Sequence, residues 1–64
     1  MDTDPLAAAM GPSAAGRYIG VSRRTLYRLI AEGEVASLTI GSRRLVLRTD
    51  LDAYLERRRA EAAS

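Results

Sequence analysis

Apolar positions between residues 11 and 31 recur with the period of an α-helix in two short stretches. The first stretch has helical spacing at Ala15, Tyr18 and Ile19. The second has apolar residues at i, i+3 and i+4, namely Leu26, Leu29 and Ile30. Two short amphipathic helices are therefore predicted, each with its apolar side toward a common core.

Residues that begin and end helices surround both stretches. Pro12 suits the first helical position, where its missing N–H costs nothing, and Gly20 ends the first helix. Ser22 is the expected N-cap of the second helix, and Gly33 is the expected residue after its C-cap. A tight, glycine-containing link between two short helices is the signature of a helix-turn-helix.

After the second helix the apolar period changes from helical to alternating. The alternating apolar positions are Leu38 and Ile40 in one run and Leu45 and Leu47 in the next. Gly41 and Ser42 suit a two-residue turn with positive φ at its first position, a register that places Ile40 opposite Arg43. A lone hairpin is only marginally stable, so we expect two strands whose single apolar face lies on the helices.

A third helix is predicted after the hairpin. Thr49 is its expected N-cap, and Asp52 three residues later forms a pair resembling a capping box. Its apolar stripe consists of Leu51, Tyr54 and Leu55. The predicted fold is mainly α with a small β-hairpin, a winged helix-turn-helix. The expected divisions are a flexible N-terminal tail (1–10), the winged helix-turn-helix domain (11–59) and a C-terminal tail (60–64).

Length and composition exclude several classes of protein. A chain of 64 residues predicts one domain, with a core that supplies about 3–5 kcal/mol of net stability. His and Cys are both absent, so we expect no zinc site, no disulfide and no histidine base. The sequence contains no phosphate-binding glycine loop and no long apolar run, and we expect no signal peptide. We expect a non-enzyme without cofactor, metal, small-molecule ligand or membrane partner, located in the bacterial cytoplasm at the nucleoid.

Positive charge is concentrated in the predicted domain. Residues 17–59 contain all ten basic residues against five acids, a balance of +5, although the whole chain carries only +2. Every basic residue is arginine, whose planar fork suits phosphates and guanine edges. Codon bias in a GC-rich genome is the alternative explanation for the missing lysine, so the placement of the arginines is more informative than their identity.

The second helix has its charged side opposite its apolar side. Arg24 and Arg28 lie nearly opposite the aliphatic stripe, and Arg23 stands in the first turn. Such a helix can enter a major groove, while its first-turn N–H groups hold a phosphate. The candidate DNA contacts are Ser22, Arg23, Arg24, Thr25, Tyr27 and Arg28. The alternative is an ordinary solvated face.

The hairpin tip adds a second basic element. Arg43 and Arg44 follow the turn and should project from opposite faces, one into a minor groove and the other against the backbone. The alternative is a charged gatekeeper that prevents edge-to-edge pairing. For the arginines at 57–59 we favour a structural role, through local ion pairs and the helix dipole.

The stretches "GVSRRTLYRLIAEGEV" and "IGSRRLVLRTDLDAYLERR" resemble the excisionase-type helix-turn-helix family, which is related to the DNA-binding half of MerR regulators. The resemblance covers roughly residues 11–59. It implies that the second helix reads the major groove of double-stranded DNA and that the wing enters the neighbouring minor groove. The chain departs from the family in its first helix, at Pro12, Gly16 and Arg17, and at Ala36, where a proline is usual. The first departure makes Arg17 a candidate backbone contact.

Short members of this family resemble phage excisionases, the recombination directionality factors. The resemblance implies a protein that binds and bends DNA beside attachment sites, with neighbouring copies of itself, and directs a tyrosine integrase toward excision. A small MerR-like transcriptional regulator is one alternative. Another is a protein-interaction module that acts on an integrase, with DNA binding secondary.

Overall fold

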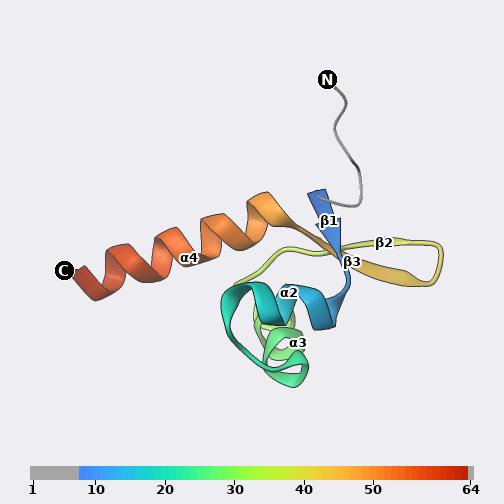
Figure 1. The fold of residues 1–64 in the computed structure, drawn as a ribbon, viewed down its shortest axis with the longest axis horizontal. Helices are drawn as coiled ribbons and strands as arrows, with labels where there is room; N and C mark the ends of the chain where they lie inside the picture. Colours follow the sequence, from blue (N-terminus) through green and yellow to red (C-terminus); the bar gives the residue numbers. More distant parts are fainter. Residues whose placement is uncertain (1–7, 64) are drawn as a thin grey trace.

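A computed structural model describes residues 8–63, and Figure 1 shows their arrangement. The elements in chain order are β1 (Ala9–Met10), α2 (Pro12–Ile19), α3 (Arg23–Ala31), β2 (Leu38–Ile40), β3 (Arg43–Leu47) and α4 (Arg48–Ala63). Helices α2 and α3 pack together beside the small sheet, and α4 extends away from it. The fold is the predicted winged helix-turn-helix, mostly helical. Of the tail expected at residues 1–10, residues 1–7 lie outside the described residues.

The turn between α2 and α3 forms as the sequence predicts. Gly20 ends α2 with a φ of 84°, a left-handed conformation that favours glycine. The Val21 amide then donates a 2.8 Å hydrogen bond to the Gly16 carbonyl. Ser22 is the N-cap of α3, and Gly33 follows the C-cap with a φ of 78°. These four positions fix the two helices in a helix-turn-helix.

Gly16 is the point of closest approach between α2 and this turn. It is buried, and a Cβ built on it would lie 2.8 Å from the Val21 carbonyl oxygen and 3.3 Å from that of Ser22. Both obstacles are backbone atoms of a turn that is fixed at each end. The glycine therefore permits the contact between α2 and the turn.

We expect Gly16→Ala to lower the free energy of unfolding by about 1–2 kcal/mol, because the steric conflict outweighs the gain in helix propensity. Chemical denaturation followed by circular dichroism measures the change. Gly11→Ala is the control, since its Cβ would meet nothing within 4 Å and the φ of Gly11 is −72°. Equal losses in both variants would show that close approach at Gly16 is not what requires glycine.

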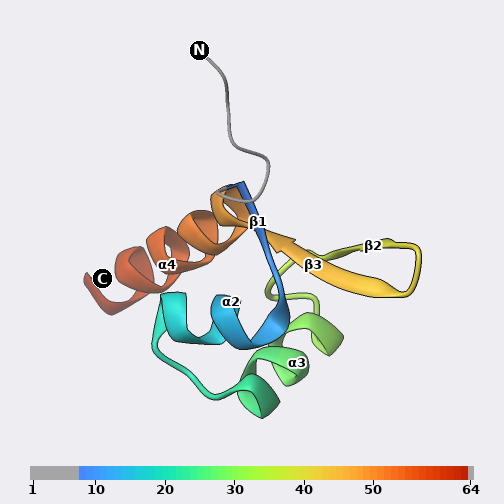
Figure 2. The same cartoon turned by 45° about the vertical axis from the view of Figure 1, so that its right-hand side comes forward.

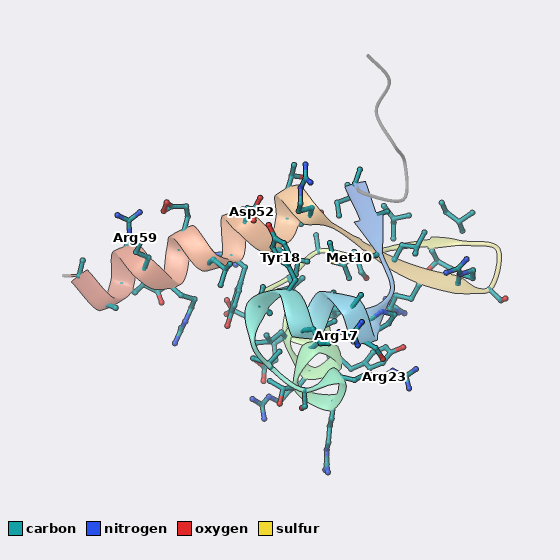
Figure 3. All side chains as sticks on the ribbon, viewed as in Figure 1. Met10, Arg17, Tyr18, Arg23, Asp52 and Arg59 are labelled. Carbon is teal, nitrogen blue, oxygen red and sulfur yellow. The ribbon has the colours of Figure 1, made fainter. Side chains whose placement is uncertain are left out.

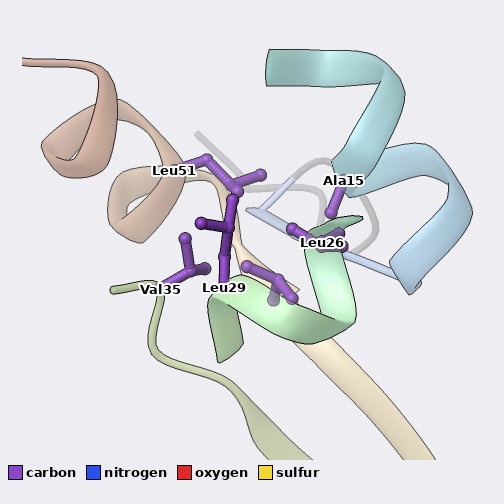
Figure 4. Packing of buried hydrophobic residues seen from close by; sticks show 6 residues of the cluster. Ala15, Leu26, Leu29, Val35 and Leu51 are labelled. Atoms are coloured by element: carbon purple, nitrogen blue, oxygen red, sulfur yellow. The ribbon is translucent and has the colours of Figure 1, made fainter. Parts of the chain in front are cut away.

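The hydrophobic core lies where the helices meet the sheet (Figure 4). Its buried members are Ala15, Leu26, Leu29, Val35, Val46 and Leu51. Ile30 and Tyr54 are partly buried and pack against it, as predicted for the second and third helices, whereas Leu55 of the predicted third stripe is 38% exposed. Tyr18 was expected to belong to the core, but 44% of it is exposed.

The sheet has three antiparallel strands in the order β1-β3-β2, where the sequence predicts only two. The register of β2 and β3 is the predicted one, with Ile40 opposite Arg43, and Gly41 in the turn has a φ of 63°. The additional strand β1 pairs Ala9 with Leu47 and Met10 with Val46. Residues 9 and 10, expected in the flexible tail, therefore belong to the sheet.

The core-facing side of β3 differs from the prediction. Val46 is fully buried, whereas the prediction directed Leu45 and Leu47 inward and Val46 outward. Side chains alternate along a strand, so Leu45 and Leu47 lie on the other face, where both are only partly buried. On that face Ile40 is 62% exposed. The reason is the pairing of Val46 with Met10, which also packs against the core.

Helix α4 starts earlier and continues further than predicted. It begins at Arg48, directly after β3, so Thr49 lies inside the helix and not at its N-cap. Asp52 bonds to another element, because Tyr18 on α2 donates its hydroxyl proton to Asp52 Oδ1 at 2.7 Å (Figure 3). This hydrogen bond raises the pKa of Tyr18 above its usual value. The helix continues to Ala63, through most of the expected C-terminal tail, and projects beyond the body in both views (Figures 1 and 2).

Candidate nucleic-acid interface

The N-terminus of α3 is organised by two hydroxyl side chains. Ser22 Oγ accepts a hydrogen bond from the Thr25 amide at 3.1 Å, and the Ser22 and Thr25 hydroxyls are 3.1 Å apart and also bonded. Ser22 is exposed and Thr25 is partly buried. Both predicted contact residues therefore stabilise the start of the helix, and Ser22 remains accessible beside its exposed first turn.

The exposed face of α3 carries the predicted arginines. Arg23, Arg24 and Arg28 are all exposed, opposite the buried Leu26 and Leu29. A shallow, open hollow on this face is lined by Arg23, Arg24 and Tyr27. The helix thus packs one side into the core and presents guanidinium groups on the other.

Two of these arginines have loose intramolecular partners. The Arg23 guanidinium lies 5.4 Å from the centre of the Tyr27 ring, a cation–π distance. Arg28 Nε is 3.9 Å from Glu32 Oε2, with the two side chains 66% and 55% exposed. Exposed pairs of this kind contribute about 0–1 kcal/mol, so a phosphate or base can displace Glu32 at little cost.

The wing places its two arginines in different surroundings. Arg44 Nη1 donates a 2.8 Å hydrogen bond to Ser37 Oγ, which links the wing to the segment before β2. Arg43 is exposed, and its side chain makes no hydrogen bond or ion pair with any part of the chain that the structure describes. Of the two predicted wing contacts, Arg43 is therefore free to contact DNA, whereas Arg44 is engaged in the hydrogen bond with Ser37. The sequence pattern gave no signal for Ser37 as its partner.

Arg17 joins the group from α2. It is exposed, and in the view of Figure 3 it lies, like Arg23, on the side of the molecule nearer the hairpin. Arg17 and Arg24, like Arg43, have no side-chain ion pair or hydrogen bond within residues 8–63. We refer to Arg17, Arg23, Arg24, Arg28 and Arg43 as the basic surface; they come from α2, α3 and the wing.

The arginines at 57–59 in α4 all have intramolecular partners, as the structural interpretation predicts. Arg58 Nη1 is 3.0 Å from Glu61 Oε1, and Arg59 Nη1 is 3.1 Å from Glu56 Oε2. Arg57 instead contacts Glu34, outside its own helix. Figure 3 shows Arg59 toward the free end of α4, at the opposite end of the molecule from the hairpin.

Residues 8–63 contain no cluster of three or more side chains able to hold a metal ion. Within the same range, none of the helices combines the length and the apolar character needed to cross a membrane.

Comparison with known proteins assigns the family. Residues 10–59 match the family described as "Helix-turn-helix domain", and the chain belongs to it. This is a DNA-binding family that includes excisionase-like proteins.

The chain is similar to Uncharacterized protein Mb2337 of Mycobacterium bovis and Uncharacterized protein Rv2310 of Mycobacterium tuberculosis. Each is 40% identical over 55 residues, which is 86% of this chain and 48% of the relative. The chain therefore spans about half the length of these relatives. No solved structure matches it.

Proposed function

We propose that the protein binds double-stranded DNA sequence-specifically, with α3 in a major groove and the wing in the adjacent minor groove. The observation that carries this proposal is the basic surface, whose arginines come from three elements and are unpaired or only loosely paired. Arginine presents a planar donor fork that matches both phosphate oxygens and the O6/N7 edge of guanine.

The roles divide by position on the fold. Arg24 and Arg28 would face the bases, and Arg23, held over Tyr27, would contact the backbone beside them. The first-turn amides of α3 with Ser22 would bind a phosphate. Arg43 would enter the minor groove, and Arg17 would contact the backbone from α2. Arg44 would contact the DNA only after releasing Ser37, so we expect it to contribute less than Arg43.

Within this class, we propose an excisionase-like role. Neighbouring copies would bind beside an attachment site, bend the DNA and direct a tyrosine integrase toward excision. Membership of a family that includes excisionase-like proteins supports this role. An excision assay with the integrase tests it. Reporter repression without an integrase would favour the small MerR-like regulator instead.

We expect DNA affinity to fall steeply with salt. Each neutralised phosphate of B-DNA contributes a slope of about −0.9 in log K against log[salt]. Arginines that enter a groove also neutralise the phosphates along its edges, so the five charges of the basic surface together give a slope of roughly −4 to −5. Fluorescence anisotropy between low and moderate salt, on a duplex selected by the protein from a random library, measures the slope. A flat dependence would contradict phosphate binding by the basic surface.

A further inference from the structure

Among the arginines at 57–59, Arg57 is the one that contacts a different part of the fold. Its Nη2 donates a hydrogen bond to the Glu34 carbonyl oxygen and lies 3.7 Å from Glu34 Oε1. Its guanidinium also lies 5.8 Å from the centre of the Tyr54 ring, and Tyr54 packs against the core. One side chain therefore joins α4 to the segment that follows α3.

The segment that Arg57 holds is the α3–β2 connector, residues 32–37. At its start, the Glu34 amide donates to the Leu29 carbonyl oxygen at 2.9 Å, and Val35 is buried in the core. At its end, Ser37 accepts the hydrogen bond from Arg44 in the wing. The connector thus spans the distance between the helix that presents Arg24 and Arg28 and the hairpin that presents Arg43.

We propose that Arg57 is a positioning residue for DNA binding: from α4 it fixes the connector, and so sets the offset between α3 and the wing. The inference rests on the proposed function, since the offset matters only if both elements bind one duplex. If α3 and the wing bind adjacent grooves, their separation must equal the groove spacing. A loosely held connector would let that separation vary and would weaken binding.

Because Arg57 and Glu34 are both exposed, this positioning role can be distinguished from a contribution to overall stability. The side chains of Arg57 and Glu34 are 51% and 48% exposed, so their ion pair adds little to the folding free energy. The backbone carbonyl, however, is a fixed acceptor, and a charged donor holds it more strongly than a neutral one. Loss of Arg57 should therefore loosen the connector while the core remains folded.

Arg57→Ala is the test, with Arg58→Ala and Arg59→Ala as matched controls. All three remove one charge from α4, but Arg58 and Arg59 pair only within that helix. On the selected duplex we expect Arg57→Ala to weaken binding by about three- to thirtyfold, and the controls by less than about twofold. Arg57→Lys, which keeps a charged donor, should restore most of the affinity.

A double-mutant cycle tests whether Arg57→Ala weakens DNA binding through the wing. Arg57→Ala should cost much less in an Arg43→Ala background, because the wing contact is already lost, and should be additive with Arg24→Ala. The salt slope should not change, whereas a direct phosphate contact by Arg57 would reduce it by about one unit. Additivity with both partners, or a reduced slope, would overturn the positioning role.

Amide hydrogen exchange in the free protein gives a readout that does not depend on DNA. We expect Arg57→Ala to accelerate exchange at Glu34 and Val35, with unchanged protection at Leu26. Unchanged connector exchange overturns the inference even if the wild-type protein binds DNA. Accelerated exchange together with no wild-type binding would overturn the proposed function instead, and with it the role of the offset.

Discussion

Replacing both Arg24 and Arg28 with alanine should abolish specific duplex binding while the protein remains folded. A bidentate arginine–guanine contact is worth about 1–3 kcal/mol, so loss of both should weaken binding by about a hundredfold or more. Both side chains are exposed, and the one ion pair removed, Arg28 with Glu32, is loose. Anisotropy at fixed salt measures the affinity, and thermal melting checks the fold.

The control for this variant is the double replacement Arg58→Ala and Arg59→Ala. It removes the same charge from α4, where both arginines pair locally. An equal loss in the control would show that net charge, and not the face of α3, determines affinity. Full binding by the Arg24 and Arg28 variant would exclude α3 from the groove. Intact function of this variant in the excision assay, despite lost duplex binding, would favour a protein-interaction module acting on an integrase.

The sequence predicts the parts of the fold that local chemistry decides. Ser22 and Gly20 mark helix ends because a hydroxyl cap and a left-handed residue act within a few positions of the chain. Gly41 fixes the hairpin register for the same reason, since a two-residue turn leaves one way to pair the strands. Exposure of the arginines on α3 follows from the helical period.

Long-range pairing accounts for the errors. β3 contains three consecutive apolar residues, Leu45 to Leu47, so alternation alone cannot decide which face is buried. That choice depends on β1, a strand of two residues too short to have a sequence pattern. Similarly, Asp52 and Tyr18 are separated by 34 positions, and Arg57 and Glu34 by 23.

These errors also affect how the interface is interpreted. The sequence treats Arg43 and Arg44 as equivalent, yet Arg44 is bonded to Ser37 and Arg43 is not. It treats Arg57, Arg58 and Arg59 as one basic run, yet only Arg57 leaves the helix among the contacts described. The tertiary contacts therefore show which arginines are free to bind DNA and which are engaged within the protein. Sequence spacing cannot make this distinction.

Leu26→Ala should leave most of the protein unfolded in the absence of DNA. Leu26 is fully buried in the core, on the side of α3 opposite its arginines. Removing a buried leucine costs about 2–5 kcal/mol, comparable to the roughly 3–5 kcal/mol that a core of this size supplies. Thermal and urea denaturation measure the loss in the free energy of unfolding. Leu55→Ala is the matched control. Leu55 is 38% exposed, so this variant should lose much less stability.

DNA should partly restore the folding of Leu26→Ala. This outcome distinguishes a variant that fails to fold from one that folds but has lost its DNA contacts. A ligand that binds only the folded state stabilises it by RT ln(1 + [L]/Kd), about 2.7 kcal/mol at a hundred times Kd. The helical circular dichroism signal of Leu26→Ala should therefore rise as the selected duplex is added. The Arg24 and Arg28 variant should be folded from the start and gain nothing. A Leu26→Ala protein that is as folded as the wild type without DNA, and that binds the duplex equally well, would contradict the role of this leucine as the support of α3.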